Sequence, residues 1–361
     1  MQHADVAIAG AGIIGLATAL ELASDGLRVV VFERGQAMHE CSWAAAGMLA
    51  ARDPESPSAL RQLSELSLRL YPEFLATIER LSGQAIPIRT NKTLQGSHAS
   101  LPGIDVLSPD AIHAIVPELC PGIATFILLE EQSLDPRDLV RALPEAVKAG
   151  GVALIEQNKV IAVRPQSNSV RIQTTQGEWD AFNFINACGA WASDLTDIPI
   201  SPRKGQILLV ESPEPLTVTI RTPDVYIVPR DSTRVVIGAT VEDIGYDRQA
   251  DPAAISRLQE AAADLWPPLR NASILESWAG LRPATPDSLP VIGPSDPIDD
   301  ETRISDSRGT AKTWQALGHF RNGIMLAPGT ARVLRQMILR QPVEVDSGPF
   351  AASRFANTFV R

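Results

Sequence analysis

A glycine-rich segment near the start of the chain has the residue types and spacing of a phosphate-binding turn. Gly10, Gly12 and Gly15 form a G-x-G-x-x-G motif between an apolar stretch and a helical pattern, and Glu33 ends the next apolar stretch. Gly10 permits a tight turn, Gly12 lets the backbone approach a pyrophosphate, and Gly15 lets the helix pack on the sheet. The helix N-terminus attracts phosphates, and an acid placed like Glu33 can accept hydrogen bonds from ribose hydroxyls. The pattern predicts a dinucleotide site.

The same segment bears on which dinucleotide binds. An acid at position 33 disfavours a 2′-phosphate, although Arg34 beside it weakens that argument. The chain has no second G-x-G-x-x-G motif, which a flavin reductase fed by NADPH would usually need for a separate nucleotide domain. A single dinucleotide that carries out the redox chemistry itself favours FAD over NAD.

A second unusual segment is WAGLRPATPD, from Trp278 to Asp287. It holds Arg282 between a small apolar stretch and two prolines. Two interpretations are open at this point: a salt bridge to the neighbouring Asp287, or a guanidinium held in place for a ligand.

Three further segments could contribute to a site, and each has an alternative. The small residues of CSWAAAGML, 41–49, could let a flat ring lie against the main chain, or could simply begin an alanine-rich helix. Gly189 and Trp191 follow a strand, either at a ligand-binding switch point of the sheet or at a plain strand end. The turn 319–323 is either a functional loop or a solvated turn.

The elements that must position these residues alternate between strands and helices in the first third of the chain. We expect a strand over 5–9, a helix to residue 24, a strand over 28–32 and a long packing helix over 58–81. Further helices are expected over 133–151, over 251–265 and from Pro328 onward. Consecutive strands separated by turns over 205–239 indicate an antiparallel sheet rather than βαβ units. The fold class is therefore α/β, with a Rossmann-like nucleotide domain interrupted by a β-rich second domain.

Composition excludes several classes of function. The chain has 361 residues, 45% hydrophobic and 20% charged, with a formal net charge of −10. Such acidity argues against nucleic-acid and membrane-surface partners, and we expect neither. The three cysteines, Cys41, Cys120 and Cys188, are widely spaced, so neither a metal site nor a dithiol pair is expected, and a reducing cytoplasm fits.

Taken together, these motifs resemble the D-amino-acid oxidase superfamily of FAD-dependent oxidoreductases, and within it the bacterial glycine oxidases of thiamine biosynthesis. The resemblance runs nearly end to end through SWAAAGML, LDPRDLVRAL, NACGAWAS, VYIVPR, WAGLRPATPD and GHFRNGI. It implies FAD bound without a covalent link, in a fold of the glutathione-reductase type. The implied FAD-binding domain comprises 1–84, 135–204 and 277–361, and the substrate-binding domain comprises 85–134 and 205–276.

The resemblance also assigns roles to residues. It places the substrate carboxylate on Arg282, with Tyr226 and Arg321 completing the substrate pocket. Besides the glycine motif, Gly189 and Trp191, it implies FAD contacts at Ile13, Ile14, Glu33, Arg34, Cys41, Ser42, Ala46, Gly47, Met48, Val160, His319, Phe320, Arg321, Asn322, Gly323, Ile324 and Met325. The polar segment 295–313 and Val241, where some glycine oxidases carry methionine, depart from the family pattern.

The activity that the resemblance implies is oxidation of glycine and other small amines or D-amino acids, with dioxygen as electron acceptor. A homo-oligomer is expected, because relatives are commonly tetramers. Three alternatives remain open: a D-amino-acid dehydrogenase that passes electrons to a quinone or a partner protein, a flavin-binding subunit without chemistry, and a tRNA-modifying oxidase. The acidic charge disfavours the last.

Overall fold

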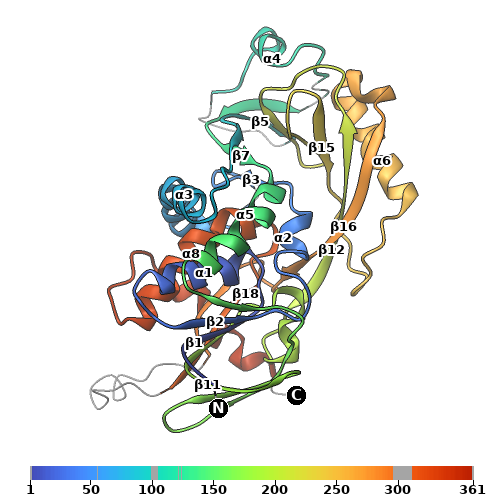
Figure 1. Cartoon of the computed structure of the whole chain (residues 1–361). Coiled ribbons are helices and arrows are strands. Elements are labelled where there is room, and N and C mark those ends of the chain that lie inside the picture. Colours follow the sequence, from blue (N-terminus) through green and yellow to red (C-terminus); the bar gives the residue numbers. More distant parts are fainter. Residues whose placement is uncertain are drawn as a thin grey trace.

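The computed structural model describes residues 2–54, 56–98, 105–120, 122, 124–295 and 311–359. The predicted polar segment 295–313 therefore lies mostly outside the described residues. Two large sheets dominate the fold (Figure 1).

The first sheet carries the predicted nucleotide-binding topology. Its eight strands are ordered β17-β18-β11-β1-β2-β8, and β10 joins β11 to β9. They are β1 (Gln2–Ala9), β2 (Val29–Phe32), β8 (Ala153–Ile155), β9 (Val160–Pro165), β10 (Val170–Thr174), β11 (Gly177–Asn186), β17 (Val291–Pro294) and β18 (Lys312–Leu317). The central neighbours of β1 are parallel to it. Buried apolar runs such as Val29–Phe32 are typical of parallel strands covered on both faces.

Four helices pack beside this sheet and share its largest hydrophobic core (Figure 1). They are α1 (Ile13–Ala23), α3 (Arg61–Ser82), α5 (Pro136–Ala149) and α8 (Gly323–Ile338). Helix α5 begins at a proline, and the Asp135 side chain caps it by accepting from the Arg137 amide at 3.0 Å. The short helix α2 (Cys41–Ala44) and the 3₁₀ helices Ser58–Leu60, Gly189–Asp194, Phe320–Asn322, Gly348–Phe350 and Ala352–Phe359 complete this part.

The second sheet has seven strands, ordered β16-β12-β15-β14-β13-β5-β6. They are β5 (Thr93–Ser97), β6 (Thr125–Leu129), β12 (Ser201–Glu211), β13 (Thr219–Arg221), β14 (Tyr226–Pro229), β15 (Arg234–Gly238) and β16 (Ile274–Ala284). The pairs are antiparallel as predicted, except that β13 and β5 are parallel. One face packs on α6 (Pro252–Leu265) through Leu208, Ile227 and Ile237. The 3₁₀ helix Pro267–Asn271 follows α6, and α4 (Pro109–Ile115) lies at the far end of this sheet.

Short strands β3 (Met48–Leu49), β7 (Gln132–Leu134) and β4 (Ile88–Thr90) form a third sheet. The long strands β12 and β16 pair over almost their whole length, and the predicted domain boundaries at 204/205 and 276/277 fall inside them. The division into two domains stays a prediction, although the α/β class is confirmed.

One predicted helix start is wrong. Helix α8 begins at Gly323 rather than at Pro328, which lies inside it. Proline removes one backbone donor, so the Ile324 carbonyl needs another partner. The Tyr71 hydroxyl of α3 supplies it at 2.5 Å, and Ser67 donates to the Met325 carbonyl at 2.6 Å. Packing against α3 thus lets the helix continue through the proline.

Candidate active site

A large cavity lies between the carboxyl ends of the first sheet's strands and the uncovered face of the second sheet. It gathers residues that are far apart in the chain. Every residue that the sequence nominated for FAD or substrate lines it, except Gly15 and Met325. Met325 is buried beneath the wall, where its carbonyl bonds Ser67.

The turn between β1 and α1 has the tight form that its glycines predict. Gly10 has φ +101°, and a Cβ there would lie 2.4 Å from the Ala187 carbonyl oxygen. A Cβ on Gly15 would lie 2.0 Å from the Gly10 oxygen, so this glycine serves helix packing rather than the cavity wall. The Ile13 amide at the start of α1 donates to Ser42 Oγ at 3.0 Å. The cavity therefore runs along a helix N-terminus with small neighbours, as a pyrophosphate requires.

Glu33 is oriented by two backbone amides at the end of β2. Its Oε2 accepts from the Ala11 amide at 2.8 Å and its Oε1 from the Gly35 amide at 2.9 Å. The side chain is buried at the cavity wall. A carboxylate held in this way keeps lone pairs for further donors, such as ribose hydroxyls.

Arg34 lies against Trp191, with its guanidinium carbon 3.6 Å from the ring centroid. It also donates to Glu40 at 2.5 Å, and Glu40 in turn pairs with Arg248 at 3.0 Å. Gly189, with φ +55°, begins the 3₁₀ helix that carries Trp191. The predicted residues 189 and 191 thus belong to the cavity wall rather than to a plain strand end.

The small-residue segment is a single helical turn followed by extended chain. Ala44 ends α2, and its carbonyl accepts from the Trp278 indole at 3.1 Å. A Cβ on Gly280 would lie 2.5 Å from the Ala44 Cβ, so both positions must be small. Gly47, with φ +89°, leads into β3. The segment thus begins with the predicted helix, here only one turn long, and it also lines the cavity.

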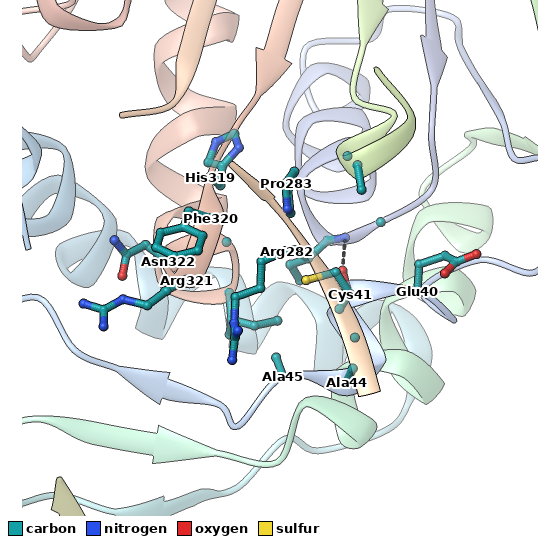
Figure 2. Close-up of a pocket in the computed structure, with 18 of the residues that line it drawn as sticks. Glu40, Cys41, Ala44, Ala45, Arg282, Pro283, His319, Phe320, Arg321 and Asn322 are labelled. Carbon is teal, nitrogen blue, oxygen red and sulfur yellow. Dashed lines mark hydrogen bonds between the residues drawn. The ribbon is translucent and has the colours of Figure 1, made fainter. Parts of the chain in front are cut away.

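Arg282 extends from β16 beside Ala44 and Ala45, with Phe320, Arg321 and Asn322 on its other side (Figure 2). Its Nη1 donates to the Thr240 carbonyl at 3.0 Å. The salt-bridge interpretation is wrong, because Asp287 pairs with Arg354 at 2.7 Å instead. Within the described part of the chain, no carboxylate forms an ion pair with Arg282.

Two glycines make room for the side chains around Arg282. A Cβ on Gly205 would lie 2.2 Å from Arg282 Nη1, and a Cβ on Gly238 would lie 2.4 Å from the Tyr226 hydroxyl. Gly205 pairs with Gly280 across β12 and β16, and Gly238 pairs with Tyr226 across β15 and β14. Both large side chains therefore lie flat across the sheet.

Electrostatics keep the hydroxyl of Tyr226 and the ring of His319 uncharged near neutral pH. Burial raises the pKa of Tyr226, although the Arg282 and Arg230 guanidinium groups oppose this. Burial lowers the pKa of His319 to about 3, and its Nε2 lies 3.0 Å from Thr330 Oγ1. Tyr226 can therefore donate a proton to a hydrogen bond, while His319 carries no charge.

The other residues of the predicted turn 319–323 form one helical turn. Phe320, Arg321 and Asn322 form a 3₁₀ helix that leads into α8. Arg321 Nη2 lies 3.3 Å from Asp53 Oδ2. Because Asp53 compensates the charge of Arg321, Arg282 is the better candidate for an anionic ligand.

Cysteine chemistry does not contribute a reactive thiolate. Cys41 and Cys188 line the cavity, and burial raises their pKa values to about 11 and about 12. All three cysteines are free. No group of potential metal ligands gathers among the described residues.

Sequence reasoning missed Gly205, Gly238, Arg230, Arg221 and Gln95. The need for glycine at positions 205 and 238 can be recognised only from the strand register, because the residues beside them form no turn motif. Arg230, which ends the VYIVPR motif, is buried and donates to the Ala46 carbonyl at 2.7 Å. Its charge after an apolar strand is a signal that could have been used.

The chain matches the family model described as FAD dependent oxidoreductase over residues 5–337. It is 34% identical to the bifunctional protein ThiO/ThiG of Trichormus variabilis over 97% of this chain and 55% of that protein, so it spans about half the length of this relative. The glycine oxidase of Pseudomonas aeruginosa is 30% identical, with 96% and 98% covered. The crystal structure of glycine oxidase from Geobacillus kaustophilus superposes with a TM-score of 0.88 at 29% identity, covering 98% and 99%.

The cavity fits FAD on its own features. The α1 N-terminus and the side-chain-free turn at Gly10 suit a pyrophosphate, and Glu33 suits a ribose. The small residues Ala44, Ala45 and Gly47 line the same cavity as residues 319–324, so a ring system could lie against them. Together with the family match, these features show that the chain belongs to the DAO family of FAD-dependent oxidoreductases.

Proposed function

We propose that the protein oxidises glycine and other small amines or D-amino acids, with dioxygen as the electron acceptor. The observation that carries this proposal is Arg282, a guanidinium on the cavity wall with no carboxylate partner in the described part of the chain. A small carboxylate would complete it, because the guanidinium fork binds planar carboxylates through parallel N–H donors. The similarity to glycine oxidases supports the same substrate class.

The chain's own residues bind and orient the substrate. Arg282 holds the carboxylate, and the protonated hydroxyl of Tyr226 donates a hydrogen bond beside it. Pro283 restricts the backbone of β16 directly after Arg282, and Gly280 lies in the paired part of the same strand. Both help to fix the direction of the Arg282 side chain. Fixing the substrate Cα relative to the cofactor supplies a proximity effect, which reaches ~7–11 kcal/mol in ideal cases.

Bound FAD would supply the redox chemistry as the acceptor of the hydride from the substrate Cα, and Glu33 and the N-terminus of α1 would help to hold it. The overall reaction removes two electrons and two protons from the substrate and reduces dioxygen to H₂O₂. The substrate amine loses a proton as the imine forms, and water then converts the imine to a 2-oxo acid and ammonia. We assign no side-chain base, on the basis that the amine binds neutral. His319 is uncharged, but its Nε2 is engaged by Thr330 Oγ1 at 3.0 Å, so we do not assign it as the base.

Four finer points belong to the same proposal. The FAD is bound without a covalent link, as the resemblance to the D-amino-acid oxidase superfamily implies. The imine from glycine serves thiamine thiazole biosynthesis, as the resemblance to bacterial glycine oxidases implies. The protein acts in the cytoplasm as a homo-oligomer, a tetramer by the same resemblance. None of the helices described is long and apolar enough to cross a membrane.

The test is H₂O₂ release by the FAD-loaded protein in air with glycine, sarcosine, D-alanine, D-proline and L-alanine. We expect peroxide from glycine and the D-amino acids and none from L-alanine. Reduction of the flavin by substrate without reoxidation in air would instead establish the dehydrogenase alternative. A yellow protein whose spectrum no amine bleaches would refute both.

A further inference from the structure

The direction of the Arg282 side chain depends on a backbone group of a neighbouring strand. The side chain extends from β16 across β12 at Gly205, where a Cβ would lie 2.2 Å from Arg282 Nη1. Nη1 then donates to the Thr240 carbonyl at 3.0 Å, just beyond the end of β15. Gly205 has no side chain that could restrain the guanidinium, so the position of the Thr240 carbonyl helps to set its direction.

A network of hydrogen bonds fixes Thr240 in turn. Its Oγ1 accepts from the Gln206 amide of β12 at 3.0 Å and donates to Glu242 Oε1. The Gln206 side chain donates to the same Glu242 oxygen at 2.8 Å. The backbone of Glu242 also exchanges two hydrogen bonds with that of Lys204, each of 2.9 Å. Residues 240–242 are thus tied to β12 through side chains as well as backbone.

This network lies away from the substrate. Gln206 is fully buried, and because it follows Gly205 in β12 its side chain projects from the opposite face of the sheet. There its Oε1 accepts from the Asp251 amide at the start of α6 at 2.6 Å. Neither Gln206 nor Glu242 lines the cavity. A satisfied polar network makes the backbone that it bonds more rigid. The network can therefore influence a substrate only through the residues that it holds.

We propose that Glu242 and Gln206 are positioning residues for substrate binding, which act through Thr240 to fix the guanidinium of Arg282 in the direction that a substrate carboxylate requires. The role rests on the proposed function and deepens it. A guanidinium that binds a carboxylate through two parallel N–H donors must be correctly oriented. A network that fixes its acceptor from behind the sheet supplies that orientation before the substrate arrives.

The first test measures binding and turnover in two variants of Glu242. Acetate is the binding probe, because it carries the carboxylate of glycine without the amine, and its Kd for the holoenzyme is read from the flavin absorbance. Glu242→Leu should raise this Kd about 10-fold and lower kcat/KM for glycine about 10- to 100-fold, because a displacement of about 1 Å can lower a rate about 100-fold. Glu242→Gln keeps an oxygen that can accept both bonds, so it should restore both values. The Kd for FAD should not change in either variant.

A second pair of variants tests the same network at Thr240. Thr240→Val removes the hydroxyl but keeps the carbonyl, and we expect both values to change in the same direction as in Glu242→Leu. Thr240→Ser should restore them. Thr233→Val is the matched control, because it removes a hydroxyl that donates to Asp231 at 3.0 Å in the turn before β15. It should leave acetate binding and turnover unchanged.

A double-mutant cycle shows whether the network acts through Arg282. In the Arg282→Met background, Glu242→Leu should have no further effect on the rate at which glycine reduces the flavin without oxygen, since interacting residues are not additive. An equal loss in the presence and absence of Arg282 would overturn the positioning role.

The outcomes distinguish this role from the proposed function. If the wild type binds acetate and oxidises glycine, and Glu242→Leu and Thr240→Val keep both values, the positioning role alone is refuted. If acetate leaves the flavin absorbance of the wild type unchanged and no amine reduces its flavin, the proposed function itself is refuted.

Discussion

At the scale of single residues, the candidate site depends on Arg282, for which the described residues provide no carboxylate partner. Arg282 touches the Thr240 carbonyl and the Tyr226 hydroxyl, and both are neutral. The carboxylate next in sequence, Asp287, is engaged by Arg354. A cation kept uncompensated on a cavity wall is most simply explained by an anionic ligand.

Replacing Arg282 tests this role directly. Arg282→Ala should cost about 2–5 kcal/mol of transition-state stabilisation, because a desolvated charge partner of the carboxylate is lost. The measurement is kcat/KM for glycine, with FAD content determined in parallel and expected to be unchanged. Asp287→Asn is the matched control and should retain activity; an equal loss in both variants would remove the carboxylate assignment.

We expect a substitution at Gly205 to lower activity as much as the loss of a charged residue would, although glycine has no side chain. In Gly205→Ala the new Cβ would lie 2.2 Å from Arg282 Nη1, so the guanidinium must move. A displacement of about 1 Å in a positioned group can lower a rate about 100-fold. We expect kcat/KM for glycine to fall by that order while FAD affinity holds. Gly348→Ala, in a 3₁₀ helix away from the cavity, should show no such fall.

Residue-level prediction from sequence finds cavity-lining residues where they lie close together in the chain. The glycine motif, Glu33 and the 319–324 turn could be nominated because each lies in one short segment, and nearly all of them line the cavity. Gly205 and Gly238 could not, because the need for glycine at these positions arises from cross-strand register. Register depends on the whole sheet, and no local pattern in the chain encodes it.

At the scale of elements, the side chain of Glu33 holds the junction of β1, α1 and β2 together. Glu33 bonds the Ala11 amide in the glycine turn and the Gly35 amide beyond β2. One carboxylate thereby fixes both loops that a dinucleotide must touch.

Glu33→Gln should therefore weaken FAD binding about 10- to 100-fold. The carboxamide can accept at only one end, so one amide loses its acceptor, and the hydrogen bonds to the ribose change. The measurement is the Kd for FAD from fluorescence titration of the apoprotein. Glu156→Gln is a suitable control, since Glu156 accepts from the Ala37 amide at 2.6 Å outside the cavity wall. Equal Kd values for the two variants would contradict the assignment.

Helix α3 has a role beyond the packing that its leucines predict. Its Tyr71 and Ser67 satisfy the carbonyls that Pro328 and the opened turn leave without helical donors in α8. The sequence locates Pro328 but not these partners, so the proline alone predicts a start for α8 that is too late. Because α8 carries the 319–324 turn, α3 supports the cavity indirectly.

Tyr71→Phe isolates this support. The Ile324 carbonyl would lose its buried donor, which costs about 1–3 kcal/mol of unfolding free energy. Urea denaturation of the variant and the wild type measures the loss. Tyr246→Phe is the control, because its hydroxyl also donates to a carbonyl but the side chain is half exposed. Similar losses in the two variants would show that the proline turn needs no help from α3.

At the scale of the whole molecule, the two large sheets enclose the cavity, so their relative placement decides whether the cofactor and substrate ends of the cavity align. Arg230, directly after β14 of the second sheet, reaches across this junction. Its guanidinium donates to the Ala46 carbonyl at 2.7 Å and to the Ala45 and Leu134 carbonyls at 3.3 Å, and lies 3.6 Å from Asp135. The predicted α/β class specifies both sheets, but it cannot specify this contact.

Arg230→Met should therefore affect stability and cofactor binding together. Three carbonyls would lose a buried donor and Asp135 would lose its partner, so we expect unfolding free energy to fall by about 3–5 kcal/mol. FAD affinity should fall as well, because Ala45 and Ala46 line the cavity. Arg234→Met, which breaks an exposed pair with Asp231, should cost only about 0–1 kcal/mol and leave FAD binding intact. If Arg230→Met loses stability but keeps its FAD affinity, the contact stabilises the fold without setting the cavity. If Arg230→Met and Arg234→Met give the same unfolding free energy and the same FAD affinity, other contacts hold the two sheets together.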